Sequence, residues 1–169
     1  MEKHVKIKEV ILILLVLVVI KFGISILYNK SEFSIKNLKY SLYTSSLESL
    51  NTEELEAAVT DLSIDDEDIS LIYVGRLTCP YCVEHISHIK DIFENFKKIS
   101  VGGEEIKVKQ FYFDSEKYNT IEALKIRDEI GAKYVPTIIL INKGKISIFS
   151  SEEIGADEYL NNFSDLIIN

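Results

Sequence analysis

The first hint of chemistry in this chain comes from its only two cysteines, Cys79 and Cys82, which lie three residues apart. No other cysteine is available for a structural bridge, so the pair is redox-active, metal-binding or incidental. Pro80 suits the first position of a helix, because its missing N–H costs nothing there and its φ is already helical. Cys79 then becomes the cap residue, with its sulfur among the unpaired N–H groups of the first turn. These groups and the helix dipole favour the thiolate of Cys79 over the thiol.

A cysteine pair of this kind predicts thiol–disulfide exchange. Cys82 follows one helical turn after Cys79, close enough for the two to form a disulfide. We expect Cys79 to be the exposed nucleophile that attacks a substrate disulfide or accepts exchange from a substrate thiol, and Cys82 to resolve the mixed disulfide. Arg76 adds positive charge if its side chain faces the pair. The plainer interpretation, two apolar cysteines that happen to share a helix, leaves the helix start, the proline and the preceding apolar run unexplained.

Zinc is the alternative that the spacing raises, because His85 and His88 continue the three-residue step of the cysteines. Each such step turns a helical position back by about 60°, so Cys79 and His88 fall on opposite faces, about 13 Å apart along the axis. Four ligands at these positions cannot converge on one ion. We therefore predict no metal site, and no cofactor apart from the Cys79–Cys82 disulfide. Both histidines are expected at the surface or half-buried, with His85 a candidate to tune Cys82.

From residue 51 onward, short apolar runs alternate with amphipathic segments. Strands are predicted at four of the runs, Ile69–Val74, Val108–Phe113, Ile138–Ile141 and Ile146–Phe149. Helices are predicted to begin at Asn51 (its cap, with Glu54 three residues on), Pro80, Thr120 and Ala156. The helix from Pro80 is expected to be long, and the last two helices to end at Ile130 and Ile167. Strands alternating with helices predict a parallel half-sheet, and the turn 142–145 predicts an antiparallel hairpin. The predicted fold class is α/β, with a central mixed sheet flanked by helices.

The segment Val10–Tyr28 is apolar apart from the single charge of Lys21. A helix of this length spans about 28 Å, close to the hydrocarbon thickness of a bilayer, and predicts a transmembrane anchor. The competing interpretations are a cleaved signal peptide with Val10–Ile20 as its apolar core and a helix buried in a soluble protein. Cleavage normally requires small residues, and the first alanine of the chain is Ala57. The predicted domains are a tail (1–9), an anchor (10–28), a stalk (29–50) and a folded domain (51–169).

Charge gives a weaker indication of where the domain lies. Lysines are nearly balanced across the predicted anchor, so the positive-inside rule does not decide its orientation. A nine-residue tail before a single span favours a cytoplasmic N-terminus, so we predict a single-pass membrane protein with an extracytoplasmic domain. The formal net charge of −8 repels phosphate backbones, and no basic stripe with interleaved aromatics is present. Nucleic acid is therefore not expected as a partner.

The cysteine motif after a buried strand, followed later by Val135-Pro136-Thr137 leading into another strand, resembles the thioredoxin superfamily. The resemblance covers roughly Asn51–Ile168, and it implies a thioredoxin-like fold. It also implies that Pro136 is a cis-proline lying against the redox pair and that the backbone at Val135 pairs with the substrate. Tyr81, Val135 and Pro136 are the substrate-binding residues that we predict on this basis. The implied partners are protein or peptide thiol or disulfide substrates and an unidentified redox partner.

Within that superfamily, residues 73–82, 111–114 and 135–137 are similar to the bacteriocin transport accessory group, which is associated with disulfide formation in exported peptides. The chain departs from plain thioredoxins, because it has no tryptophan and carries Tyr73 in place of their buried acid, six residues before the first cysteine. This change calls into question the usual proton relay to the resolving cysteine. The Cys-Pro-Tyr-Cys motif also matches glutaredoxins, but residues 150–153 lack their glutathione-binding glycine pair.

The predicted function is that of a membrane-tethered thiol–disulfide oxidoreductase acting on exported proteins or peptides at Cys79 and Cys82. The sequence leaves the direction open among oxidase, reductase and isomerase. The alternative is a thioredoxin-like adaptor or chaperone module of a secretion or transport complex, without essential redox turnover. A third hypothesis is the binding of a cluster by two chains through Cys79, as in some glutaredoxins.

Overall fold

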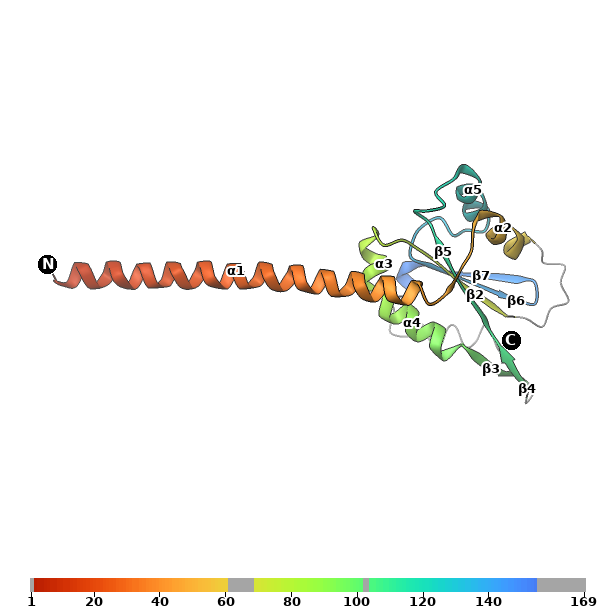
Figure 1. Ribbon diagram of the computed structural model, residues 1–169, viewed down its shortest axis with the longest axis horizontal. Coiled ribbons are helices and arrows are strands. Elements are labelled where there is room, and N and C mark those ends of the chain that lie inside the picture. The colour runs from red at the N-terminus through yellow and green to blue at the C-terminus, as the bar shows by residue number, and fades with distance from the viewer. Residues whose placement is uncertain (1, 61–68, 102–103, 155–169) are drawn as a thin grey trace. The chain divides into compact units, whose positions relative to one another are not determined.

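The computed structural model describes residues 2–60, 69–101 and 104–154 (Figure 1). The chain divides into two compact units, one that ends at Leu38 and one that begins at Lys39. The long helix α1 (Glu2–Thr44) supplies the first unit and the opening residues of the second. The predicted helix over 156–167 lies outside the described residues. The catalytic chemistry proposed from the sequence falls entirely in the second unit.

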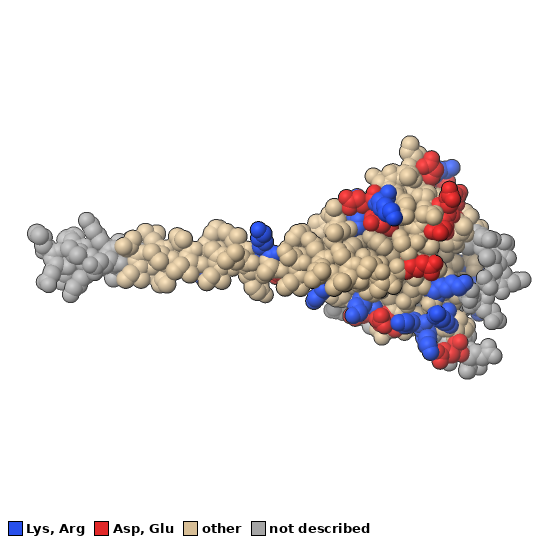
Figure 2. Space-filling model, in the orientation of Figure 1, with Lys and Arg blue, Asp and Glu red and all other residues tan. Residues whose placement is uncertain are grey.

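The first unit is a stretch of α1 with an apolar surface. Between Leu12 and Leu27 its large apolar side chains are 49–70% exposed, and Figure 2 shows few charged residues along it. The helix has the length and composition to cross a membrane, and a signal sequence near the N-terminus meets the same criteria. The anchor at 10–28, its orientation and the predicted domain boundaries therefore stay predictions.

The second unit is built on a five-stranded sheet with the order β1-β5-β2-β6-β7. Strands β1 and β2 run parallel to β5, β6 runs antiparallel to β2, and β7 runs antiparallel to β6. This confirms the predicted mixed sheet with its C-terminal hairpin. The strand bounds are β1 (Glu48–Ser49), β2 (Ser70–Gly75), β5 (Lys109–Asp114), β6 (Thr137–Asn142) and β7 (Lys145–Phe149).

Helices cover both faces of this sheet, which explains why its central strands are apolar throughout. On β2, Leu71 and Tyr73 point into one core, whereas Ile72 and Val74 point into the other. The helices that contribute to the Tyr73 core are α3 (Pro80–Glu84), α4 (Ile86–Asn95), α6 (Ser151–Ile154) and the end of α1. The helices of the opposite core are α2 (Thr52–Thr60) and α5 (Ile121–Glu129).

The start of α2 follows the sequence prediction. The backbone N–H of Asn51 donates to Glu54 Oε2 at 2.7 Å, and the N–H of Glu54 donates to Asn51 Oδ1 at 2.9 Å. These reciprocal bonds form a capping box that satisfies two N–H groups the helix itself leaves unpaired. The predicted cap is confirmed.

Three features of this unit differ from the sequence predictions or were missed. The helix expected from Pro80 is interrupted at His85, whose φ of −89° and ψ of 4° separate α3 from α4. A second sheet of two strands, β3 (Lys98–Val101) and β4 (Glu104–Lys107), follows α4 and was not predicted. An ion pair between Lys98 and Glu105 links these strands. The third feature is the packing of Tyr40 and Thr44, which lie within the predicted stalk but are buried in this unit.

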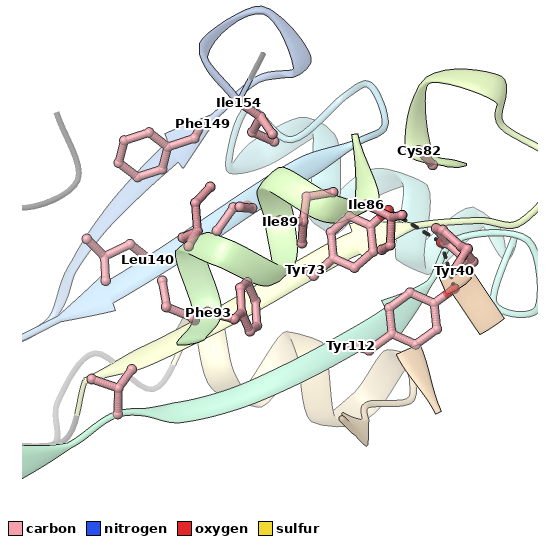
Figure 3. Close-up of a cluster of buried hydrophobic side chains, with 14 of the residues drawn as sticks. Tyr40, Tyr73, Cys82, Ile86, Ile89, Phe93, Tyr112, Leu140, Phe149 and Ile154 are labelled. Carbon is pink, nitrogen blue, oxygen red and sulfur yellow. Dashed lines mark hydrogen bonds between the residues drawn. The ribbon is translucent and has the colours of Figure 1, made fainter. Parts of the chain in front are cut away.

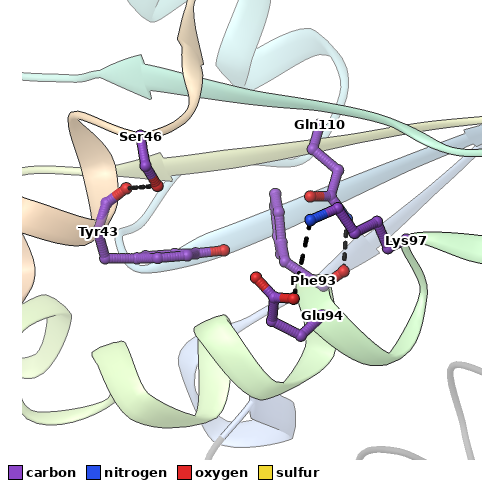
Figure 4. A network of polar contacts seen from close by, with 6 residues as sticks. All are labelled: Tyr43, Ser46, Phe93, Glu94, Lys97 and Gln110. Atoms are coloured by element: carbon purple, nitrogen blue, oxygen red, sulfur yellow. Dashed lines mark hydrogen bonds and ion pairs between the residues drawn. The ribbon is translucent and has the colours of Figure 1, made fainter.

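The C-terminal end of α4 is tied to the sheet by side-chain contacts (Figure 4). The Gln110 amide of β5 donates to the carbonyl of Phe93, and Lys97 lies 3.9 Å from Glu94. Tyr43, near the end of α1, packs edge-on against Phe93 with ring centroids 6.4 Å apart. Helix α3, which carries Cys82, is therefore followed by helix α4, whose C-terminal end is fixed to the sheet by these contacts.

Candidate functional site

Cys79 lies at the turn between β2 and α3 and caps the helix, as predicted. Its backbone is extended, with φ −88° and ψ 113°, and Pro80 occupies the first turn of α3. The Cys79 Sγ accepts the backbone N–H of Cys82 at 3.3 Å, which satisfies one of the unpaired donors of that turn. The buried strand β2 thus places the sulfur of Cys79 at the N-terminus of helix α3.

The two sulfurs differ in burial. The prediction of an exposed Cys79 is wrong, because the segment at Val135 packs against its sulfur: Cys79 is buried and keeps 7% of its surface exposed, whereas Cys82 has none. Cys82 belongs to the same buried core cluster as Ile86 and Ile89 of the next helix, and both cysteines are free thiols in this structure. A group that approaches from solvent therefore meets Cys79 first.

The segment before β6, which contains Val135 and Pro136, contacts Cys79. The peptide bond between Val135 and Pro136 is cis, as the resemblance to thioredoxins implies. The Cys79 Sγ donates to the carbonyl of Val135 at 3.6 Å. Residues that lie far apart in the sequence, 79 and 135, are therefore in direct contact.

Arg127 of α5 is hydrogen-bonded to the backbone just before this segment, a contact that sequence analysis missed. The residue as a whole is 6% exposed, with Nε donating to the carbonyl of Ala132 at 3.1 Å and Nη2 to the carbonyl of Lys133 at 3.1 Å. Burial lowers the pKa of Arg127, with the nearby charge of Arg76 acting in the same direction. The only signal in the sequence was an arginine among the apolar positions of a predicted amphipathic helix.

Exposed aromatic side chains flank the pair. Tyr81, between the two cysteines, is 63% exposed, and Tyr134, next to Val135, is 79% exposed. Leu77, two residues before Cys79, is 43% exposed. An accessible apolar rim of this kind suits contact with a peptide or protein, since such surfaces are enriched where partners bind.

Burial raises the pKa of Cys82 to about 12, and its hydrogen bond with Cys79 acts in the same direction. A hydrogen bond from the backbone of Arg76 and one from the side chain of Tyr73 oppose this rise. Cys82 is therefore a thiol at neutral pH. The side chain of Arg76 is exposed, and its carbonyl accepts the Cys79 N–H at 3.2 Å, so its predicted electrostatic role at the pair stays a prediction.

The two histidines lie as expected, with His85 half-buried and His88 exposed. Their rings are tilted with centroids 5.8 Å apart. Within the described ranges, no three His, Cys, Asp or Glu residues lie close enough together to hold a metal ion.

Three tyrosines lie on the core side of Cys82 (Figure 3). Tyr73 from β2, Tyr40 from the end of α1 and Tyr112 from β5 bring their phenol groups together within the same core as Cys82. The Tyr73 hydroxyl donates to the Tyr40 hydroxyl at 3.4 Å, and the Tyr40 and Tyr112 hydroxyls are 3.2 Å apart. Sequence analysis identified Tyr73 by its position, but it did not anticipate Tyr40 or Tyr112.

Comparison with known proteins bears on the fold. No protein-family model matches the chain, and no curated protein matches its sequence. Among solved structures, thioredoxin from Trypanosoma brucei brucei is similar over 72% of this chain and 90% of its own, at 14% identity and a TM-score of 0.50. The fold is thioredoxin-like. The predicted fold class, a mixed sheet flanked by helices with an N-terminal apolar helix, is thus confirmed.

Two further thioredoxins cover similar shares of the chain. Mitochondrial thioredoxin 3 from Saccharomyces cerevisiae, in its oxidised form, matches 76% of this chain and 96% of its own at 15% identity, with a TM-score of 0.46. Fasciola hepatica thioredoxin matches 72% of this chain and 96% of its own at 12% identity, with a TM-score of 0.45. Thioredoxin-like proteins work with a redox-active disulfide and no external cofactor. At 14% identity, the likeness to the thioredoxin from Trypanosoma brucei brucei establishes the fold alone, so the reaction rests on the geometry of the site.

Proposed function

We propose that this protein is a membrane-tethered thiol–disulfide oxidoreductase whose catalytic residues are Cys79 and Cys82. One observation carries the proposal: the Cys79 sulfur caps α3, contacts the N–H of Cys82 and lies against the carbonyl of Val135. The pair would form the redox-active disulfide itself, so no separate cofactor is required.

In the reducing direction, the Cys79 thiolate attacks one sulfur of a substrate disulfide. A bond forms between Cys79 and that sulfur, the substrate disulfide breaks, and the departing sulfur takes a proton from water. The Cys82 thiol then attacks the Cys79 sulfur, and its proton passes to the second departing substrate sulfur. The protein ends as the Cys79–Cys82 disulfide, and two electrons have moved to the substrate. The same steps in reverse oxidise a substrate dithiol.

The difference in burial supports this division of roles. The slight exposure of Cys79 gives a substrate access to one sulfur, while the complete burial of Cys82 keeps it from forming mixed disulfides of its own. Cys82 is nonetheless adjacent to Cys79, because the two are hydrogen-bonded to each other. Cys82 is thus placed to act only after Cys79 has reacted.

The substrates that fit this site are extended segments of proteins or peptides. Val135 is half-buried and Pro136 is buried, and the carbonyl of Val135 lies beside Cys79. The side chain of Tyr81 is exposed to solvent. A peptide that pairs with the backbone at Val135 would bring its own sulfur to Cys79. We assign Tyr81, Val135 and Pro136 to substrate binding, and a separate redox partner restores the pair after each turnover.

The tether is the anchor at residues 10–28, supported by the exposed apolar side chains of α1. With the domain on the extracytoplasmic side, the substrates would be exported proteins or peptides. The comparisons lend no support to the bacteriocin transport accessory group, so that narrower assignment rests on sequence motifs alone.

Replacement of the first sulfur tests the reaction. The full chain in detergent micelles should accelerate the reduction of insulin disulfides by dithiothreitol, and Cys79→Ser should return the rate to the uncatalysed background. Cys82→Ser is the matched control, because it keeps the nucleophile and should accumulate a mixed disulfide with insulin at Cys79. Undiminished activity of Cys79→Ser would refute the proposal and favour the adaptor function. The reduction potential of the pair then decides the direction of the reaction.

A further inference from the structure

We propose that Tyr73, Tyr40 and Tyr112 form a tyrosine triad that positions and stabilises the Cys82 sulfur during the resolving step, in place of a buried carboxylate. Tyr73 is the member that donates a hydrogen bond to this sulfur as it ionises. The inference rests on the proposed function, because it assigns a role within the second half of the same reaction.

The geometry of the triad is that of a chain of hydroxyl groups. Tyr73 is fully buried, Tyr40 is 2% exposed and Tyr112 is 8% exposed. The chain runs from Tyr73 to Tyr40 at 3.4 Å and from Tyr40 to Tyr112 at 3.2 Å, and Tyr112 donates to the carbonyl of Gly75 at 3.4 Å. The rings hold this arrangement, since Tyr73 and Tyr112 stack at 5.6 Å while Tyr40 meets both edge-on at 6.2 and 6.4 Å.

Cys82 lies at one end of this chain. Hydrogen bonding with Tyr73 opposes the rise in the pKa of Cys82, which is the effect of a hydroxyl that donates to the thiolate. The Tyr73 hydroxyl carries one proton and has two acceptors, the Tyr40 oxygen and the Cys82 sulfur. When Cys82 is a thiol the proton points to Tyr40, and when Cys82 ionises it turns to the sulfur. Tyr40 can then donate to Tyr73 in return, because either atom of the Tyr40–Tyr112 pair can be the donor.

The tyrosines differ from an acid in one chemical respect. Burial raises the pKa of Tyr73 and of Tyr112 above the usual value of a phenol. Both therefore keep their protons at neutral pH and can donate hydrogen bonds, but they cannot act as bases. Among the described residues, none of the buried ones is an Asp or a Glu. The Cys82 proton accordingly passes to the departing substrate sulfur, and the triad stabilises the negative charge that builds up on the Cys82 sulfur before its bond to Cys79 forms.

Gly75 gives the triad its space. A Cβ at this position would overlap the phenol of Tyr73 and lie 2.9 Å from the Tyr40 hydroxyl. The Gly75 carbonyl also accepts hydrogen bonds from the hydroxyl and the backbone N–H of Ser115, at 3.2 and 2.9 Å. A methyl group here would displace the hydroxyl chain without removing any of its members.

The titratable and charged groups that interact with Cys82 come from several elements. They are Cys79 and the Arg76 backbone at the turn, Tyr73 on β2, Tyr40 on α1, Tyr112 on β5 and Arg127 on α5. Among these side chains of the described residues, Tyr73 is the one that is both hydrogen-bonded to Cys82 and linked to further hydroxyls. This makes Tyr73→Phe the most selective substitution for a test.

The two half-reactions can be measured separately with 5,5′-dithiobis(2-nitrobenzoate). Attack by Cys79 releases one thionitrobenzoate and leaves the second bound to Cys79, and attack by Cys82 then releases the second. In the reduced full chain in detergent micelles, Tyr73→Phe should slow the second release about tenfold and leave the first unchanged, since a hydrogen bond to a charged group is lost. The pH profile of the second release should also move to higher pH. Tyr40→Phe should give a smaller slowing, and Gly75→Ala should slow the second release as well.

Tyr43→Phe is the matched control. Its phenol is part-buried in the same core, and its hydroxyl has no hydrogen-bond partner among the described residues. This variant should leave both releases unchanged. A second release from Tyr73→Phe at the wild-type rate, or equal slowing of both releases, would overturn the triad and leave the proposed function intact. If the unsubstituted protein showed no first release of thionitrobenzoate, the proposed function itself would be overturned.

Discussion

At the scale of single residues, burial separates two cysteines that the sequence presents as equals. Both belong to one short motif and both are buried, yet Cys79 keeps a slight exposure to solvent and Cys82 has none. The spacing of Cys79, Pro80 and Cys82 predicts which sulfur caps the helix, because that depends only on where the helix begins. Which side chains surround the second sulfur depends on packing between distant segments, so Tyr40 and Tyr112 could not be predicted.

The buried thiol should make stability depend on pH. An unfolded chain loses the Cys82 proton near the ordinary cysteine pKa of about 8.5, whereas the folded protein holds it up to about 12. The folded pKa is raised, so the stabilising contribution is complete below about pH 8.5 and declines as pH rises toward 12. Urea unfolding of the reduced protein between pH 7 and 10 should show a falling midpoint, and Cys82→Ala should fall less steeply. Parallel slopes in the two proteins would contradict this. Above about pH 10, Tyr73 and Tyr112 add an effect of the same sign.

At the scale of elements, the second unit is completed by pieces that precede its first predicted helix. Tyr40 from the end of α1 and Leu50 after β1 are both buried, in the two opposite cores. The backbone N–H of Leu50 donates to the carbonyl of Tyr112 at 2.9 Å, which extends the pairing of β1 with β5. The sheet therefore depends on residues 39–50 for its edge and for part of its packing.

Truncation measures this dependence. A chain that begins at Lys39 should unfold cooperatively, whereas one that begins at Asn51 should be less stable by at least about 3 kcal/mol, the usual cost of removing one large buried aromatic side chain. Urea unfolding at neutral pH gives the comparison. Equal midpoints would show that residues 39–50 are dispensable for the folded unit.

The same scale shows where sequence reasoning succeeds. Long apolar runs such as Ile69–Val74 and Ile138–Ile141 identify strands buried on both faces, and the Asn51–Glu54 pair identifies a helix start, because these signals are local. The interruption at His85 has no breaker residue to announce it. The β3–β4 hairpin is short and mixes charged with apolar residues, so its pattern is too weak to distinguish from a loop.

At the scale of the whole molecule, the chain joins a thioredoxin-like unit to a helix whose apolar side chains have no cover within the described residues. Large aliphatic side chains exposed along several turns are costly in water, and a bilayer is the solvent that accommodates them. A signal peptide would also be apolar, but it would be removed from the mature protein.

Membrane fractionation separates these two outcomes. The full chain should remain in the membrane pellet after extraction with alkaline carbonate and should keep its N-terminal mass, whereas a chain that begins at Lys39 should be released. Protease added outside intact cells should digest the folded unit if it is extracytoplasmic. Release of a shortened full-length product into the supernatant would identify a signal peptide and refute the tether.

Gly75 ties together residues that the linear sequence keeps apart. Because the hydroxyl ends of Tyr73 and Tyr40 occupy the space that a side chain would need, a lineage that retains both phenols is confined to a hydrogen atom at position 75. A lineage that exchanges the phenol at 73 for a smaller group keeps only the closer approach of the Tyr40 hydroxyl, at 2.9 Å from a Cβ at position 75. Inheritance at these three sites should therefore be correlated, although one of them lies in a helix outside the central sheet.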